Sequence, residues 1–299
     1  MLRADDANSG RKAITQNIGQ GIGLIVLAIG LLSSLDAMVK WLTGGFSLAQ
    51  IVFFRNLFGL LPVFIIIQMQ GGARAIRTRR PGFHIFRVFL ILTIAFSFFW
   101  ALSRMELADA TALFFTVPLF ITIMSVIVLG ETVGMRRWIA VAAGFGGVLL
   151  VIRPGSGVFD LGAIGVLVAS LGYAALMISN RAIRGKETPA TLTFFTTTGC
   201  VLVTGCALPW VWVEPSAFEW GVMAAMGIFG GTGQILLIFA FQRAPAGVIA
   251  PFEYTTLIWA TFYGFVIWGD LPDMQTVIGA AIIAAGGVYI LYRETMTKP

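Results

Sequence analysis

Long apolar stretches alternate with short polar segments along the whole chain. The stretches cover residues 20–42, 47–68, 85–103, 108–129, 138–152, 160–179, 190–213, 219–241, 246–268 and 275–292. Most of them reach the ~20 residues that an α-helix needs to cross a hydrocarbon core of ~30 Å. They lack the period-two alternation of membrane β-strands. The pattern therefore predicts an all-α integral membrane protein with ten transmembrane helices.

The ten stretches fall into two sets of five, in residues 1–153 and 154–299. Short motifs recur at equivalent places, since Gly130-Glu131 in the first half matches Gly269-Asp270 in the second. Because five crossings is an odd number, the second half must be inserted upside down relative to the first. Inverted repeats of this kind build many secondary transporters, whose substrate site lies near the middle of the membrane. We therefore expect two inverted five-helix repeats around a central cavity.

The composition and the placement of charge also favour a membrane protein. Hydrophobic residues make up 58% of the chain and charged residues 11%, whereas a soluble domain has about a quarter charged residues. The net charge is +6, and with the N-terminus inside, all 20 basic residues lie in or beside cytoplasmic segments except Lys40, Arg55, Arg104 and Arg153. Positive charge gathers on the cytoplasmic side of membrane proteins. This distribution of basic residues predicts that both termini lie in the cytoplasm. It also indicates that the partner is a lipid bilayer and not nucleic acid.

Three charged residues interrupt the apolar stretches and differ between the two halves. They are Asp36, Arg55 and Glu253, at positions where the other half has Leu, Thr and Phe. Each charge near a helix centre disfavours insertion by about 2.5–3.5 kcal/mol. Such residues usually face a partner or a watery cavity, and a functional role is their default interpretation. We expect them close to a substrate site.

Arg55 lies near the middle of the second predicted helix. Its guanidinium suits a carboxylate through two parallel hydrogen bonds, and Asn56 beside it can assist. The structural alternative is that Arg55 pairs with Asp36 or with backbone carbonyls and that Asn56 joins helices. Asp36 and Lys40 are four residues apart on one helix face. They either pair with each other near the helix end or contact the substrate.

Two prolines are expected to break helices at membrane depth and to allow gating. Pro251 removes a backbone hydrogen bond two residues before Glu253, and Pro118 lies inside the fourth span. Unwound backbone is tolerated in a membrane where it packs within protein or lines a cavity. There the Glu253 carboxylate can receive a substrate ammonium group or a coupling proton. The alternative is a hydrogen-bonded structural acid.

Aromatic side chains far from the span ends are candidates for the cavity wall. They are Trp100, Phe115, Tyr173 and Tyr254, and Gln234 interrupts a glycine-rich span as a further candidate. Apolar walls with a few polar groups are typical of small-molecule sites. The alternative for each residue is ordinary packing or contact with lipid.

Other chemistries have little support. The single histidine, His84, is at a predicted helix start and is expected at the membrane interface. Cys200 and Cys206 are six residues apart on one predicted helix, which fits neither a disulfide framework nor a metal site. The sequence contains no phosphate loop, zinc signature or nucleophile elbow. We expect no catalytic residue, metal, cofactor or enzyme activity.

Several of these motifs together resemble the EamA-type signature of the drug/metabolite transporter superfamily. The residues are Ala101-Leu102, Ala108, Ala112, Pro118-Leu119, Leu129-Gly130-Glu131 and the glycines of 144–147. Arg55 lies where that family often has an arginine, and Asp270 stands where the second unit often repeats the glutamate. The resemblance covers both halves and implies ten helices in two inverted units, a central cavity, and export or exchange of small metabolites.

The whole chain is most similar to bacterial inner-membrane exporters of aromatic and other neutral amino acids. We therefore expect a multi-pass secondary transporter of the bacterial cell inner membrane that exports small amphipathic metabolites, aromatic or bulky neutral amino acids first. Protons are a candidate coupling ion. Carriers of nucleosides, vitamins or organic acids are the alternative. A membrane enzyme or a lipid-handling protein would need a reactive pair at membrane depth, and the sequence shows none.

Overall fold

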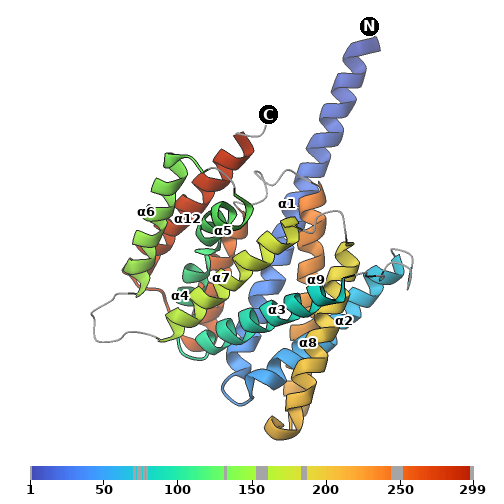
Figure 1. Ribbon diagram of the computed structural model, residues 1–299, viewed down its shortest axis with the longest axis vertical. Helices are drawn as coiled ribbons and strands as arrows, with labels where there is room; N and C mark the ends of the chain where they lie inside the picture. The colour runs from blue at the N-terminus through green and yellow to red at the C-terminus, as the bar shows by residue number, and fades with distance from the viewer. Residues whose placement is uncertain are drawn as a thin grey trace.

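The computed structural model describes residues 2–69, 72, 76, 78, 80–130, 133–152, 161–182, 187–243 and 252–296. Within these ranges, side chains are described over 19–289, apart from 137, 181, 182, 189 and 242. All regular structure in the described residues is helical (Figure 1). The helices are α1 (Leu2–Leu42), α2 (Leu48–Met69), α3 (Pro81–Leu102), α4 (Leu107–Phe114), α5 (Val117–Leu129), α6 (Met135–Ile152), α7 (Leu161–Ala182), α8 (Pro189–Val211), α9 (Ala217–Arg243), α11 (Thr255–Tyr263), η2 (Gly264–Trp268) and α12 (Met274–Met296).

Among the described residues, seven helical segments are long and apolar enough to cross a membrane, and α4 with α5 counts as one of them. Three shorter apolar helices, Trp138–Ile152, Thr255–Trp268 and Met274–Tyr289, follow the predicted fifth, ninth and tenth spans. The all-α membrane fold is thus confirmed, and the count of ten crossings stays a prediction.

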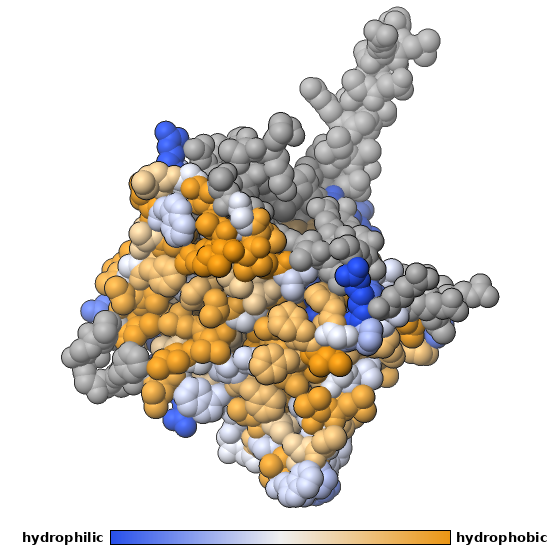
Figure 2. All heavy atoms as spheres, in the orientation of Figure 1, coloured by the Kyte–Doolittle hydropathy of each residue, from blue (hydrophilic) through white to orange (hydrophobic). Residues whose placement is uncertain are grey.

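The outside of the bundle is apolar. Figure 2 shows hydrophobic residues over most of the visible face, with hydrophilic ones confined to a few places near its edges. Large side chains on this surface are well exposed, including Phe64 at 59%, Ile85 at 71% and Trp210 at 82%. Contiguous apolar surface of this extent does not suit a soluble monomer. It suits contact with lipid.

The start of α1 and the end of α12 lie at the same end of the bundle (Figure 1). Helices α1 and α3 end, and α12 begins, at the opposite end, which we call the distal end (residues 40–46, 102–106 and 269–274). The positive-inside pattern predicts that the distal end faces away from the cytoplasm.

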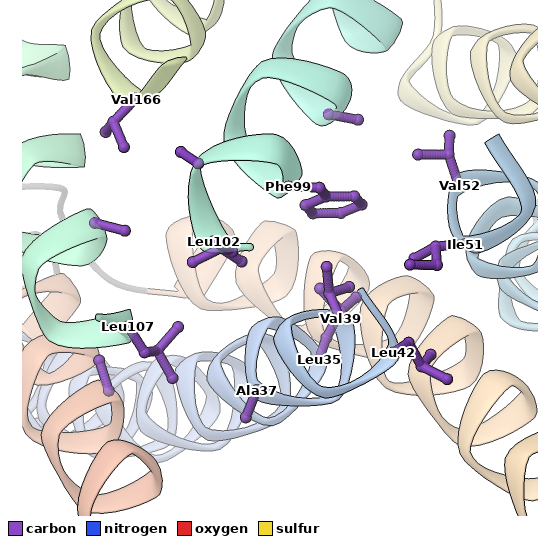
Figure 3. Close-up of a cluster of buried hydrophobic side chains, with 14 of the residues drawn as sticks. Leu35, Ala37, Val39, Leu42, Ile51, Val52, Phe99, Leu102, Leu107 and Val166 are labelled. Atoms are coloured by element: carbon purple, nitrogen blue, oxygen red, sulfur yellow. The ribbon is translucent and has the colours of Figure 1, made fainter. Parts of the chain in front are cut away.

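A cluster of buried hydrophobic side chains lies in the distal half of the bundle. Figure 3 shows Leu35 and Val39 of α1 facing Phe99 of α3, with Ile51 of α2 beside them and Val166 of α7 on the far side. These five side chains are at most 3% exposed. The core therefore ties helices from both halves of the chain together.

Helices α6 and α12 meet along glycines. A Cβ atom built on Gly147 would lie 2.7 Å from the backbone oxygen of Gly279, and one on Gly279 would lie 2.8 Å from that of Gly147. At the next contact, Gly286 is held close to the backbone oxygen of Ala140. Small residues let membrane helices approach this closely. This glycine seam joins the last helix of each half.

The fourth predicted span, 108–129, is two helices instead of one. Helix α4 ends in a turn at Phe115 and Thr116, where the Thr116 N–H donates to the oxygen of Leu113 at 3.0 Å. Helix α5 then starts with Pro118 in its first turn, where a missing N–H is not needed. The chain is therefore interrupted just before Pro118, inside a predicted span.

Candidate functional site

Helix α9 brings α1 and α2 together through glycines. A Cβ atom at Gly227 would lie 2.9 Å from the backbone oxygen of Arg55, and one at Gly233 would lie 3.1 Å from that of Ala28. Between them, a Cβ at Gly230 would lie 3.9 Å from the Arg55 Nε. Only glycine allows backbones so near to each other. Helix α9 thus fixes the place of Arg55 beside α1.

Asp36 of α1 and Arg55 of α2 form the first polar position of the site. They lie close enough for their charges to interact, yet no ion pair within 4.0 Å or hydrogen bond engages either side chain among the described residues. Both side chains are partly exposed, and neither has a polar atom shut off from solvent. The guanidinium lies 5.5 Å from the ring centroid of Phe99. One cation and one anion therefore lie near each other without an ion pair or a hydrogen bond among the described residues.

Each half also contributes a helix that breaks at an equivalent place. The break before α5 includes Phe115 and Thr116, and the break before α11 is the turn at Tyr254. Thr116 and Tyr254 have the same backbone angles, φ −68° and ψ −13°. The rings of Phe115 and Tyr254 are 4.8 Å apart, so the two breaks lie against each other. Pro251, the second predicted helix breaker, lies outside the described residues.

Glu253 precedes the turn at Tyr254 and forms the second polar position. Its charge reaches the hydroxyls of Tyr254 and of Tyr173 on α7. Within the described part of the chain, no ion pair or hydrogen bond engages its carboxylate. The side chain is exposed. An acid between two phenols can accept a hydrogen bond, a proton or an ammonium group.

Aromatic rings connect the two polar positions. Phe99, beside Arg55, has its ring 6.4 Å from that of Phe98, and Phe98 lies 5.1 Å from Phe114. The Phe114 ring in turn lies 5.7 Å from that of Tyr173. Phe98, Phe114 and Tyr173 are only partly buried. They form a row of aromatic rings from Phe99 to Tyr173, between the two polar positions.

Two of the expected polar residues point elsewhere. Asn56 is buried and its Nδ2 donates to the Val52 oxygen of its own helix at 2.8 Å. Lys40 does not pair with Asp36, four residues away, but lies 3.6 Å from the Asp270 carboxylate. At the end of α1, the Met105 oxygen at 3.0 Å and the Asp270 carboxylate give the Lys40 ammonium group its partners.

Trp100 and Gln234 also lie apart from the two polar positions. The Trp100 ring stacks under Arg104, with the guanidinium 4.5 Å from its centroid, near the distal end of α3. Gln234 is exposed on α9. The structure thus brings together Asp36 with Arg55, and Glu253 with Tyr173, Tyr254 and Phe115.

A third polar group joins α3, α7 and α8. Arg87 is 7% exposed and donates to the Asn180 side chain, and its Nε donates to the Thr196 hydroxyl at 3.3 Å. We expected Arg87 in a cytoplasmic segment. The available signal was its place within an apolar helix, since Arg87 is the seventh residue of α3 and Arg55 is the eighth of α2.

His84, which we expect at the membrane interface, lies at the start of α3 and is 4% exposed. Its Nε2 lies 3.0 Å from the Thr78 hydroxyl and 4.0 Å from the Glu187 carboxylate. The Thr78 hydroxyl donates to that same carboxylate at 2.8 Å. These contacts fasten the start of α3 to the segment before α8, and they explain a polar side chain there without substrate chemistry.

Comparison with known proteins gives the chain a family. The profile of the EamA-like transporter family matches twice, over residues 19–153 and 160–292. A solved crystal structure of a protein superposes with a TM-score of 0.66 at 18% identity and covers 94% of this chain and 99% of its own. That likeness supports the fold.

Curated relatives match over nearly their full length. An S-adenosylmethionine uptake transporter of Rickettsia bellii is 28% identical over 274 residues, which is 92% of this chain and 94% of the relative. A pseudopaline exporter of Pseudomonas aeruginosa is 27% identical, over 88% and 93% of the two chains. A riboflavin transporter of Rhizobium johnstonii is 29% identical, over 90% of each. With both halves matched by its profile, the chain belongs to the EamA-like transporter family.

Proposed function

We propose that the protein is a secondary transporter that moves small amphipathic metabolites across the bacterial inner membrane by alternating access. The observation that carries this proposal is the open pair of Asp36 and Arg55, two charges at membrane depth without a bonded partner in the described structure. A charge at membrane depth has a high free-energy cost of insertion, so it is usually kept for a function. A ligand that brings its own charges would offset that cost in one state of the cycle.

The chemistry of the two polar positions favours solutes with an amino-acid head and an apolar body. Arg55 would hold the carboxylate through two hydrogen bonds. Asp36 would take the ammonium group, Glu253 would take a second amine or a coupling proton, and the rings of Phe98 and Phe114 would contact the apolar body. Aromatic and bulky neutral amino acids fit this description, and the proposed direction in the cell is export.

A second set of substrates follows from the relatives. Proteins similar to this chain over most of its length carry the names of transporters for S-adenosylmethionine and riboflavin. S-Adenosylmethionine combines an amino-acid head with a planar base, so it would use the same two positions. Riboflavin has no such head and would depend on the aromatic wall. The two solutes therefore separate the contributions of charge and of stacking.

The test is solute counterflow in proteoliposomes, with and without a pH gradient. Labelled L-tryptophan, L-leucine, S-adenosylmethionine, riboflavin and a nucleoside are compared as counter-substrates. We expect the amino-acid-headed solutes to exchange fastest. Counterflow of riboflavin or the nucleoside alone would overturn the amino-acid proposal in favour of the alternative carrier class.

Arg55 provides the matched residue test. Arg55→Lys and Arg55→Gln should each lower exchange of carboxylate solutes by at least tenfold, since losing one partner of a buried charged hydrogen bond costs about 2–5 kcal/mol. Arg243→Gln is the control, because its guanidinium also lies over a phenylalanine, 5.4 Å from the Phe239 centroid, but at the end of α9. Wild-type exchange in a folded Arg55→Gln variant would remove Arg55 from the site.

A further inference from the structure

A hollow of about 410 Å³ opens at the distal end of the bundle, between the end of α1, the link from α3 to α4 and the link from η2 to α12. This volume falls in the range of ~300–1,000 Å³ that is usual for small-molecule pockets. Its charged lining residues are Lys40, Arg104, Glu106, Asp109 and Asp270. The site described above does not include the five charges gathered in this hollow.

Lys40 holds the three segments around this hollow together. Its ammonium group donates to the backbone oxygen of Met105 at 3.0 Å and lies 3.6 Å from the Asp270 carboxylate. It also lies 4.8 Å from the centroid of the Trp268 ring. One side chain of the first half thus joins its own half to the second half at the distal end.

The Lys40–Asp270 pair lies close to the first polar position along α1. Asp36 lies one helical turn below Lys40 on the same face of α1, and the charge of Asp36 interacts with Arg55. Lys40 is only 12% exposed and Asp270 is 33% exposed. The ion pair therefore lies one helical turn distal to Asp36, at the wall of the hollow.

The charges of the hollow favour an ammonium group over a free anion. Three of the five charged lining residues are acidic, and all three act on Lys40. The 3.6 Å separation of the pair is longer than the ~2.7–2.9 Å of a strong charge-assisted hydrogen bond. A second ammonium group can therefore compete with Lys40 for Asp270 at small cost.

We propose that the distal hollow is a docking site for amine-bearing solutes, and that the solute's ammonium group takes the place of Lys40 at Asp270 and so opens the distal mouth. The inference rests on the proposed transport function and adds a selection step ahead of the Asp36–Arg55 position. Organic acids without an amine reach the hollow but do not separate Lys40 from Asp270.

The test follows how fast a cysteine below the pair is labelled from the distal side. In a background without Cys200 and Cys206, Ser34→Cys is the reporter, since Ser34 lies six residues, or ~9 Å, deeper on α1 than Lys40. Its hydroxyl lies 2.7 Å from that of Tyr263. An impermeant methanethiosulfonate reagent is added to right-side-out and to inside-out vesicles.

Tryptamine and L-tryptophan should speed labelling of the reporter about fivefold, the ratio that corresponds to release of a half-buried ion pair of about 1 kcal/mol. Indole-3-propionate, which has the carboxylate but no amine, should leave the rate unchanged. Asp270→Asn should label at the fast rate without any solute. Exchanging the two charges, with Lys40→Asp and Asp270→Lys together, should restore slow labelling.

Ser103→Cys at the rim of the hollow is the control reporter. It identifies the vesicles that present the distal end, and equal rates in all variants show that they are folded. Slow labelling in Asp270→Asn, or acceleration by indole-3-propionate in place of tryptamine, overturns the inference. The labelling assay does not depend on transport. If amines speed labelling but amino acids show no counterflow, the proposed substrate class is rejected and the docking site is retained.

Discussion

Replacing Gly227 with alanine should push α9 away from α2. A Cβ atom there would lie 2.5 Å from the Cβ of Phe58, 2.9 Å from the backbone oxygen of Arg55 and 3.0 Å from the backbone nitrogen of Gly59. These contacts fall 0.4 to 0.9 Å short of the 3.4 Å at which ordinary contact begins. Two of the three neighbours are backbone atoms, which cannot rotate away, so the helix itself must move.

The expected loss of stability follows from that overlap. Forcing an extra methyl group into a packed interface costs about 1–3 kcal/mol. At about 2–4 °C per kcal/mol for a chain of a few hundred residues, the melting temperature should fall by roughly 2–12 °C. Because the Arg55 backbone is one of the atoms displaced, counterflow of carboxylate solutes should fall as well.

Gly221→Ala is the matched control, because it adds the same methyl group to the same helix at a position with no atom within 4 Å. Both variants are melted in detergent while tryptophan fluorescence is followed. Gly221→Ala should melt at or slightly above the temperature of the unmodified protein. Equal melting temperatures for the two variants would refute the argument that the α9–α2 contact depends on a bare backbone.

Three further changes test other parts of the structure. Asn56→Ala should change the counterflow KM by less than about twofold, because its amide already donates to its own helix; a tenfold loss, about 1.4 kcal/mol, would return Asn56 to the site. Glu253→Gln should abolish the response of transport to a pH gradient while exchange at equal pH persists, and an intact response would separate Glu253 from coupling. Arg87→Met should lower stability by about 1–3 kcal/mol, since Asn180 loses its buried donor, and an unchanged melting temperature would argue against this network.

Hydrophobic length alone predicted most of the fold. The apolar spans Gly19–Leu42, Leu48–Gln68 and Ala217–Phe241 begin and end within a few residues of their predictions, because the length of an apolar stretch limits where a membrane helix can lie. Helix α1 itself begins further upstream, at Leu2. The break before Pro118 follows from the missing N–H of proline. The shape of the break, with Phe115 against Tyr254, depends on packing between residues 139 positions apart, which no local pattern contains.

The candidate site was only partly predictable for a similar reason. Charge inside an apolar span pointed to Asp36, Arg55 and Glu253 because insertion of a charge is costly wherever its partner lies. The partner itself is set by tertiary contacts. Lys40 could be matched to Asp36 by helix spacing, but the loop after η2 offers Asp270 at the same end of the bundle. Arg87 was counted with the cytoplasmic segments because basic residues near helix ends usually serve topology.

The glycine seam between α6 and α12 limits how the two halves can diverge. The backbone at Gly147 and the backbone at Gly279 each occupy the space that a side chain on the other would need. A larger residue at either position would therefore force α6 and α12 apart. Interior positions carry no such mutual constraint. The second half has threonine at 196 where the first half has Arg55, so the two halves differ in charge at this position while the contact between α6 and α12 is kept.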